Sequence, residues 1–243
     1  MHTPTPETPR PEPAATRSPA RRRWTRVLRF VAVATLGATV AWAATSAWSR
    51  WAASAAIARY EPREGDVIFQ SLPHGPVVWA IEGVTGSPYS HCGIVGREDG
   101  QWIVYEAIGR VRVTPLRDYL ERGRGGGFAV YRLRDEFAGH IPATLQCCRT
   151  YLGRPYDIRY RLDDEKIYCS ELIYKAFRDA TEGQELGTLS RFGDMDWGAY
   201  EVLIRQIEDG PVPVDRMMIT PVGLARAPQL VPVYWHNLAI EAR

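Results

Sequence analysis

A cysteine opens an amphipathic helical pattern in the C-terminal half of the chain. In the stretch EKIYCSELIYKAF, which runs from Glu165 to Phe177, Cys169 is followed by apolar residues at the spacing of one buried helical face. The positive end of a helix favours a thiolate, so a cysteine at this point is a candidate nucleophile. The unpaired N–H groups of the same turn are candidate donors to an oxyanion. The alternative interpretation is that Cys169 is a small core residue.

A histidine and a glutamate that could serve this cysteine come from a predicted β-hairpin. Residues 91–97 (HCGIVGR) and 101–109 (QWIVYEAIG) are two predicted strands, joined by an Asp-Gly pair that is typical of two-residue turns. With that turn, Gly93 lies opposite Glu106, so that His91 and Glu106 share one face as diagonal neighbours. We therefore predict a His–Glu pair. The alternative is a histidine at a strand start and a glutamate on a solvated face.

The other three cysteines lack such surroundings. Cys148 lies on an apolar helical face and is predicted to be a core residue, while its neighbour Cys147 has no histidine partner. Cys92 points to the strand face opposite His91, so we expect it to be inert. The spacing of the cysteines and histidines fits neither a disulfide framework nor a structural zinc site. We expect no metal.

The elements that must position these residues form one predicted α+β domain, from residue 60 to residue 243. Strands followed by helices indicate an antiparallel sheet packed against helices. The glycine-rich segment 123–128 leads into a strand and lacks the Gly-Lys-Ser/Thr ending of a phosphate loop, so it is predicted to be a flexible loop at the domain edge. Besides the hairpin, we predict strands at 64–69, 110–114 and 128–133, and helices at 75–85, 142–152 and 170–180.

The first 51 residues carry a different pattern. Residues 1–26 are rich in proline and arginine and are predicted to be disordered. Residues 27–51 are predicted to form one hydrophobic helix, because Phe30–Trp48 is a run of nineteen residues without a charge. The arginine cluster before it would hold the N-terminus in the cytoplasm.

Two interpretations of this hydrophobic segment stay open. As an uncleaved anchor it would hold the domain at the cytoplasmic membrane, on the periplasmic or extracytoplasmic side. As a signal peptide it would be cleaved near Ala41-Trp42-Ala43, and the domain would be secreted. In either case we expect the segment to contact a membrane.

The net charge of +2 conceals an uneven distribution. Residues 1–29 contain seven arginines and two glutamates, so the remainder is slightly acidic. Because no basic stripe is left in the domain, we expect no nucleic-acid partner.

Four segments carry a resemblance to a known family: SPYSHCGIV, VYEA, GRPYDIRYRLDDEKIYCSEL and ITPVGLARAPQL. Over residues 62–235 the chain resembles the YiiX/YaeF-type permuted papain-like amidases, relatives of the NlpC-type cell-wall hydrolases. The resemblance implies a circularly permuted papain-like fold, in which the histidine strand precedes the nucleophile helix. It implies Cys169 as the nucleophile, His91 as the base and Glu106 as the group that orients the base.

Further polar residues lie beside the same motifs. Tyr89, Tyr156 and Tyr168 are candidate oxyanion donors or substrate-binding residues, and the alternative for each is ordinary packing. Asp157 and Glu171 could shape the electrostatics of the site. Glu171 also suits the first turn of a helix without any catalytic role.

The expected function is a thiol-dependent amidase or peptidase that cleaves an amide or ester through a thioester, with no metal or organic cofactor. Its expected substrate is a small molecule, a peptide or a lipid. Two alternatives stay open: a lipid acyltransferase that uses the same Cys–His site, and an inactive binding module.

Overall fold

The structure, a computed structural model, describes residues 54–238. The segments predicted to be a disordered tail (1–26) and a membrane anchor or signal (27–51) lie outside this range. Within residues 54–238 no helix is long and apolar enough to cross a membrane.

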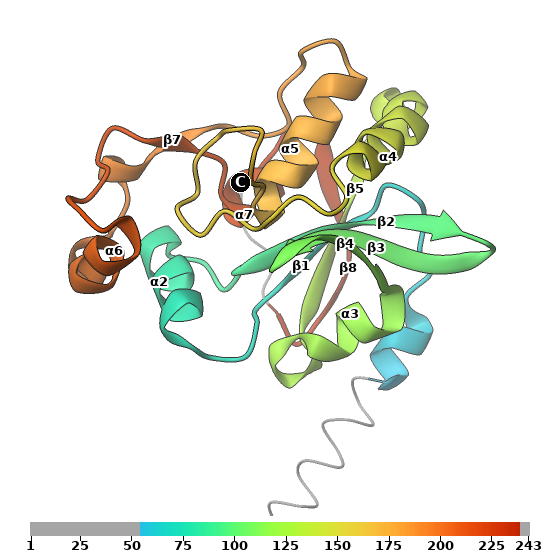
Figure 1. Ribbon diagram of the computed structural model, residues 1–243. Coiled ribbons are helices and arrows are strands. Elements are labelled where there is room, and N and C mark those ends of the chain that lie inside the picture. The colour runs from blue at the N-terminus through green and yellow to red at the C-terminus, as the bar shows by residue number, and fades with distance from the viewer. Residues whose placement is uncertain (1–53, 239–243) are drawn as a thin grey trace, which may run out of the picture. The chain divides into compact units, whose positions relative to one another are not determined.

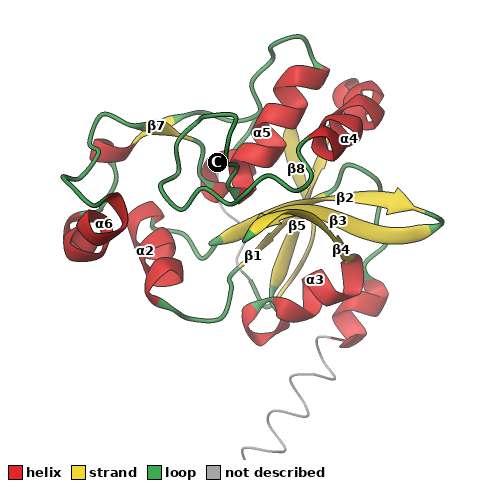
Figure 2. Cartoon of the chain, viewed as in Figure 1, coloured by secondary structure: helices red, strands yellow, loops and turns green. Residues whose placement is uncertain are grey.

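Six antiparallel strands form the central sheet (Figures 1 and 2), in the order β4-β3-β2-β1-β5-β8. β1 pairs with β2 on one side and with β5 on the other, and β8 forms the edge beyond β5. The predicted antiparallel sheet is therefore present. The strands are β1 (Val67–Gln70), β2 (His91–Glu98), β3 (Gln101–Ile108), β4 (Arg110–Pro115), β5 (Phe128–Leu133) and β8 (Leu230–His236).

The β2–β3 hairpin has the register that the sequence predicts. Asp99 and Gly100 take φ angles of 48° and 78°, the left-handed pair that a two-residue hairpin turn requires. Gly93 consequently lies opposite Glu106. A side chain at Gly93 would collide with Val104, because its Cβ would lie 2.4 Å from a methyl carbon of that valine.

Helices cover both faces of the sheet (Figure 1). On one face lie α4 (Ile141–Thr150) and α5 (Cys169–Ala180), over a core that includes Cys92 and Tyr105. On the other face lies α3 (Leu116–Arg122), whose buried Tyr119 belongs to a second cluster. Alternate strand residues therefore enter different clusters.

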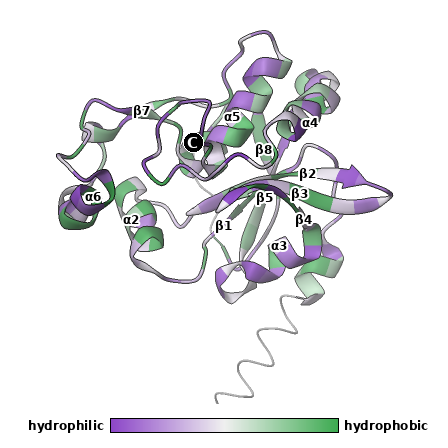
Figure 3. Ribbon diagram, in the orientation of Figure 1, coloured by the Kyte–Doolittle hydropathy of each residue, from purple (hydrophilic) through white to green (hydrophobic). Residues whose placement is uncertain are grey.

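The remaining elements flank the start of α5. They are α2 (Pro76–Thr85), α6 (Glu201–Glu208), α7 (Pro221–Ala225) and the two-stranded pair β6 (Ser190–Arg191) and β7 (Met217–Met218). In Figure 3, α6 carries both hydrophobic and hydrophilic residues, as an amphipathic helix does.

Each predicted helix and strand matches an observed one to within a few residues, but the glycine-rich segment needs a correction and six observed elements were not predicted. The glycine-rich segment, expected to be a flexible loop, contains a 3₁₀ turn (Arg124–Gly126) that is bonded to the domain. Arg124 donates its backbone N–H to Ser71 at 2.7 Å and forms an ion pair with Glu82 at 3.1 Å. The elements that were not predicted from the sequence are α3, α6, α7, β6, β7 and β8.

Candidate active site

Cys169 is the first residue of α5, and Tyr168 occupies the N-cap position. The side chain of Cys169 is buried, with 2% of the residue exposed, but it lines a pocket that opens to solvent. The N–H groups of the first helical turn have no partner within the helix. The sulfur therefore lies at the positive end of a twelve-residue helix.

The His–Glu pair predicted from the hairpin is present as a buried hydrogen bond. Nε2 of His91 lies 2.6 Å from Oε2 of Glu106, and both residues are nearly inaccessible to solvent. Three further donors hold the carboxylate: Thr114 at 2.5 Å, Arg112 at 3.3 Å and Arg122 at 2.5 Å. These three donors hold the Glu106 carboxylate in place, and the carboxylate in turn orients the imidazole of His91.

Helix α3 supports the imidazole from beneath. The ring of Tyr119 lies against His91, with centroids 5.6 Å apart, and its hydroxyl donates to the backbone oxygen of Ile68 at 2.9 Å. The guanidinium of Arg122, which binds Glu106, lies 5.2 Å from the centre of the Tyr119 ring. One short helix therefore supports both members of the His–Glu pair.

The charges at the site point to a thiolate beside an imidazolium. Burial alone would lower the pKa of His91, but hydrogen bonds and charge interactions with Cys169 and Glu106 raise it to about 9. Burial would raise the pKa of Glu106, but His91, Arg122 and Thr114 lower it to about 2. The pKa of Cys169 lies well below its ordinary value, because hydrogen bonds from Cys92 and His91 outweigh the cost of burial.

Cys92 is a member of the site that the sequence analysis missed. It lies on the strand face opposite His91, as expected, but that face is the one on which Cys169 packs. Hydrogen bonding from Cys92, through its thiol and its backbone N–H, helps to lower the pKa of Cys169. The alternation of residues along a strand predicts the face of the sheet on which a side chain lies. It does not predict which helix residue packs on that face, so the proximity of Cys92 to Cys169 could not be predicted from the sequence.

The three candidate tyrosines occupy different places. Tyr89 stacks on Phe69 at 5.0 Å within the core, and its hydroxyl lies 3.3 Å from that of Tyr131. Tyr168 lines the pocket, but its hydroxyl accepts the N–H of Ile219 at 3.0 Å. Tyr89 is therefore a core residue, and Tyr168 anchors the start of α5.

Tyr156 is hydrogen-bonded to a fourth tyrosine, Tyr160, which was not among the candidates from the sequence. Its hydroxyl donates to that of Tyr160 at 3.5 Å, which leaves the Tyr160 proton available to another acceptor. Tyr160 lines the pocket together with Cys169, and its ring packs on Tyr168 at 5.3 Å. Its φ of 54° is unusual for an aromatic residue, and such strain concentrates at functional sites.

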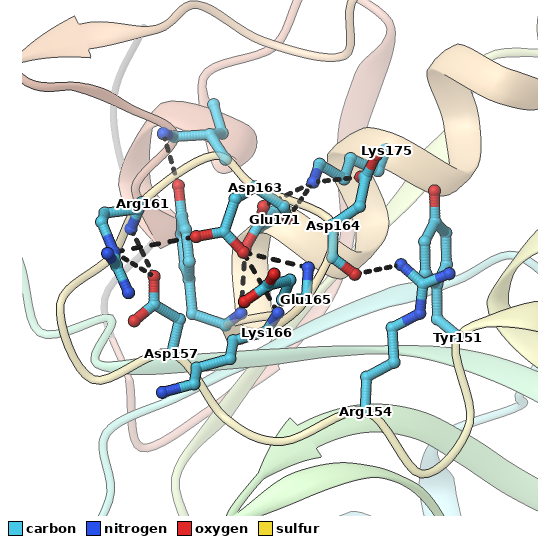
Figure 4. A network of polar contacts seen from close by, with 12 residues as sticks. Tyr151, Arg154, Asp157, Arg161, Asp163, Asp164, Glu165, Lys166, Glu171 and Lys175 are labelled. Carbon is cyan, nitrogen blue, oxygen red and sulfur yellow. Dashed lines mark hydrogen bonds and ion pairs between the residues drawn. The ribbon is translucent and has the colours of Figure 1, made fainter.

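Asp157 and Glu171 shape the backbone around the cysteine without lining the pocket. Asp157 accepts the N–H groups of Arg159 at 3.0 Å and Arg161 at 2.7 Å, which holds the loop before α5. Figure 4 shows Asp157 beside Arg161. Glu171 accepts the N–H of Tyr168 at 3.1 Å, as an N-terminal capping residue does. Its burial raises its pKa to about 7 despite an ion pair with Lys175 at 2.8 Å.

The pocket beside Cys169 is an open depression of about 770 Å³, a volume that includes open solvent. Its exposed wall is mostly apolar, although nine residues with polar side chains also line it: Thr85, Ser90, Arg159, Tyr160, Tyr168, Ser170, Glu208, Arg216 and Thr220. α2 and α6 supply much of the apolar wall, with Val77, Ala80, Ile81, Leu203, Ile204 and Ile207. A pocket with a mostly apolar wall suits an apolar organic group.

Comparisons with known proteins agree with this geometry. The family described as permuted papain-like amidase enzyme, YaeF/YiiX, C92 family, matches residues 61–234. The uncharacterized protein YiiX of Escherichia coli strain K12 is 29% identical over 177 residues, which cover 72% of this chain and 87% of that protein. The crystal structure of yiiX from Escherichia coli O157:H7 matches with a TM-score of 0.68 and 27% identity, over 73% of this chain and 99% of that one.

The yiiX crystal structure is described as that of a metalloprotein. Among residues 54–238 of this chain, no group of three or more His, Cys, Asp or Glu side chains is arranged to hold a metal ion. Glu106, the carboxylate nearest to His91, is already bonded to that histidine, two arginines and a threonine. The described residues of this chain do not fit a metal centre at this site.

Proposed function

The chain belongs to the permuted papain-like amidase family YaeF/YiiX, and on that premise we propose that it is a thiol-dependent hydrolase that cleaves an amide or ester through a Cys169 thioester. The observation that supports this most directly is the meeting of Cys169, at the start of α5, with the buried His91–Glu106 pair. Nucleophile, base and orienting group are the parts that a cysteine hydrolase needs.

The proposed reaction begins from the thiolate of Cys169 and the imidazolium of His91. Because Nε2 of His91 faces Glu106, the proton used in catalysis is on Nδ1. The sulfur attacks the carbonyl carbon, and Nδ1 gives its proton to the departing amine or alcohol. Nδ1 of the neutral imidazole then takes a proton from water, and the resulting hydroxide releases the acid from the thioester.

Two sets of donors are proposed for the oxyanion. The first consists of the unpaired N–H groups in the first turn of α5, beside the sulfur. The second is the hydroxyl of Tyr160, which lines the pocket with Cys169 and receives a hydrogen bond from Tyr156. In this proposal Tyr156 acts through Tyr160.

The apolar pocket favours a hydrophobic acyl group as the part of the substrate that forms the thioester. Burial contributes about 0.8 kcal/mol for each methylene that leaves water, so a long acyl chain would gain most from this wall. The same pocket also suits transfer of the acyl group to a lipid acceptor, which is the second candidate function. Product analysis with and without an acceptor lipid separates hydrolysis from transfer.

The proposed location is the outer side of the cytoplasmic membrane, either anchored there or beyond it after signal cleavage. This part of the proposal rests on the uncharged run Phe30–Trp48 and the arginines before it.

The test is the pH dependence of alkylation at each cysteine of the full-length chain, followed by mass spectrometry. We expect Cys169 to react with a midpoint well below the free-thiol value of about 8.5, and His91→Ala to move that midpoint upward. Cys147, which lies near the surface of α4, is the internal reference. If Cys169 reacts no faster than Cys147, or if His91→Ala changes nothing, the cysteine is a packing residue and the proposal is wrong.

A further inference from the structure

Two of the four cysteines are neighbours at the site. Cys92 in β2 and Cys169 in α5 are both buried, at 0% and 2% exposure, and belong to one core cluster. Hydrogen bonding from Cys92 is the largest cause of the lowered pKa of Cys169, and all four cysteines of the chain are free. The elements that carry them, 77 positions apart in sequence, are the sheet and the helix that packs on it.

The two thiols differ in access and in charge. Cys169 lines the solvent-connected pocket, whereas Cys92 is fully buried and is not part of the pocket wall. Burial and the neighbouring Cys169 raise the pKa of Cys92 well above its ordinary value, so Cys92 keeps its proton. A small oxidant that enters the pocket therefore reaches the Cys169 thiolate before the protonated thiol of Cys92.

This asymmetry is the arrangement of a reactive thiol and a resolving thiol. We propose that Cys92 is the resolving cysteine of a reversible oxidation site, which closes a Cys92–Cys169 disulfide when a peroxide reaches the pocket. The inference rests on the thiolate character proposed for Cys169 and goes beyond the proposed hydrolysis.

The chemistry takes two steps. The Cys169 thiolate attacks one oxygen of the peroxide, the O–O bond breaks, and Cys169 becomes a sulfenic acid while hydroxide or alkoxide leaves. The Cys92 sulfur then attacks the sulfenic sulfur, its proton joins the departing hydroxyl as water, and the S–S bond forms. Two electrons pass from the two thiols to the peroxide, and a dithiol reductant reverses the change.

The disulfide would have two consequences for the site. It would occupy the sulfur of Cys169, so the chain would lose its nucleophile until reduction. It would also divert the sulfenic acid from further oxidation to the sulfinic acid, which thiols cannot reduce.

The experiment treats the full-length chain with hydrogen peroxide, alkylates the remaining thiols and maps the peptides by mass spectrometry. We expect a peptide pair joined between Cys92 and Cys169, and recovery of nearly all Cys169 alkylation after dithiothreitol. Cys92→Ala and Cys92→Val should lose the joined pair and recover several-fold less Cys169, as sulfinic acid accumulates. The valine variant avoids the cavity that alanine would leave, and circular dichroism verifies that each variant is folded.

Cys147→Ser and Cys148→Ser are the matched controls and should behave as the wild type. The inference is overturned if wild-type Cys169 passes to sulfinic acid without a disulfide, or if its disulfide joins Cys147, Cys148 or a second chain. It is equally overturned if folded Cys92→Val recovers as much Cys169 as the wild type. Amide hydrolysis is measured separately, so that a joined peptide pair without turnover contradicts the proposed function alone.

Discussion

At the scale of single residues, the site depends on how Glu106 is held. A carboxylate with no exposed surface ordinarily favours its neutral form, yet four donors keep Glu106 ionised, with a pKa of about 2. Its charge helps to raise the pKa of His91 to about 9. Glu106, together with Cys169, therefore raises the pH up to which His91 keeps its proton.

We predict that Glu106→Gln lowers kcat by about a hundred- to ten-thousand-fold and moves the alkaline limb of the pH profile to lower pH. The active form needs the imidazolium of His91, and activity is lost as pH rises through its pKa. Without the carboxylate that pKa falls from about 9 towards the ordinary 6.5. The measurement is kcat/KM against pH on an amide or ester substrate that the wild type hydrolyses.

Glu98→Gln is the matched control, because Glu98 lies in the same hairpin but its carboxylate accepts from Tyr105, at 2.5 Å, and not from His91. It should leave the profile unchanged. An alkaline limb that stays in place in Glu106→Gln would show that His91 does not depend on Glu106 for its charge.

Some of these residues were within reach of sequence reasoning and others were not. His91 and Glu106 could be paired because an Asp-Gly turn fixes the hairpin register and the register fixes the faces. Cys92 and Tyr160 could not be placed, because their neighbours come from other elements. The contact of Cys92 depends on which residue of α5 covers the sheet, and that of Tyr160 on a backbone turn with positive φ.

At the scale of elements, α5 is buried more completely than its pattern indicates. The apolar spacing after Cys169 predicts one buried face, but residues 169–177 are buried all round. The loop before the helix covers the other side, and Lys175 bonds to it through Asp163 and Asp164 (Figure 4). A lysine with 3% exposure is acceptable there because it also neutralises Glu171.

We predict that Lys175→Met lowers the free energy of unfolding by about 3 kcal/mol at pH 8, since it leaves the Glu171 carboxylate buried without its cation. The loss should be smaller at pH 5. The pKa of Glu171 is about 7, so at pH 5 its carboxyl group is protonated and needs no cation beside it. Urea unfolding at the two pH values measures both effects.

The control is Lys166→Met, at the other lysine of the sequence, which is exposed. Its change should stay within about 0.5 kcal/mol. The Lys175–Glu171 pair would not stabilise the start of α5 if both variants lost the same free energy of unfolding. The same would follow if the loss in Lys175→Met were equal at the two pH values.

At the scale of the whole molecule, the pocket is assembled from segments that are distant in sequence. α2, the loop before α5, α6 and the strand β7 all contribute to its wall. Periodicity identified α2 as a helix but could not bring it beside α6, which was not predicted at all. The order of strands in the sheet was equally out of reach, because the pairing of β1 with β5 and of β5 with β8 is nonlocal.

The pocket leads to a prediction about acyl chain length. If its apolar wall binds the acyl group, kcat/KM should rise by about fourfold for each added methylene, the equivalent of about 0.8 kcal/mol, until the pocket is full. Ala80→Phe introduces a ring into the α2 wall and should end that rise several carbons earlier, with little effect on the shortest substrates. The measurement is kcat/KM over a series of amides or esters of increasing acyl length.

Val202→Phe adds the same ring to α6 at a position that is 74% exposed and outside the pocket wall, so it should retain the wild-type dependence on length. Alkylation of Cys169 by a small reagent should be the same in all three proteins, because the ring shortens the pocket without reaching the sulfur. If kcat/KM depends on acyl chain length in the same way in the wild type and in Ala80→Phe, the acyl group does not bind in this pocket. The pocket would then bind the leaving group of the substrate.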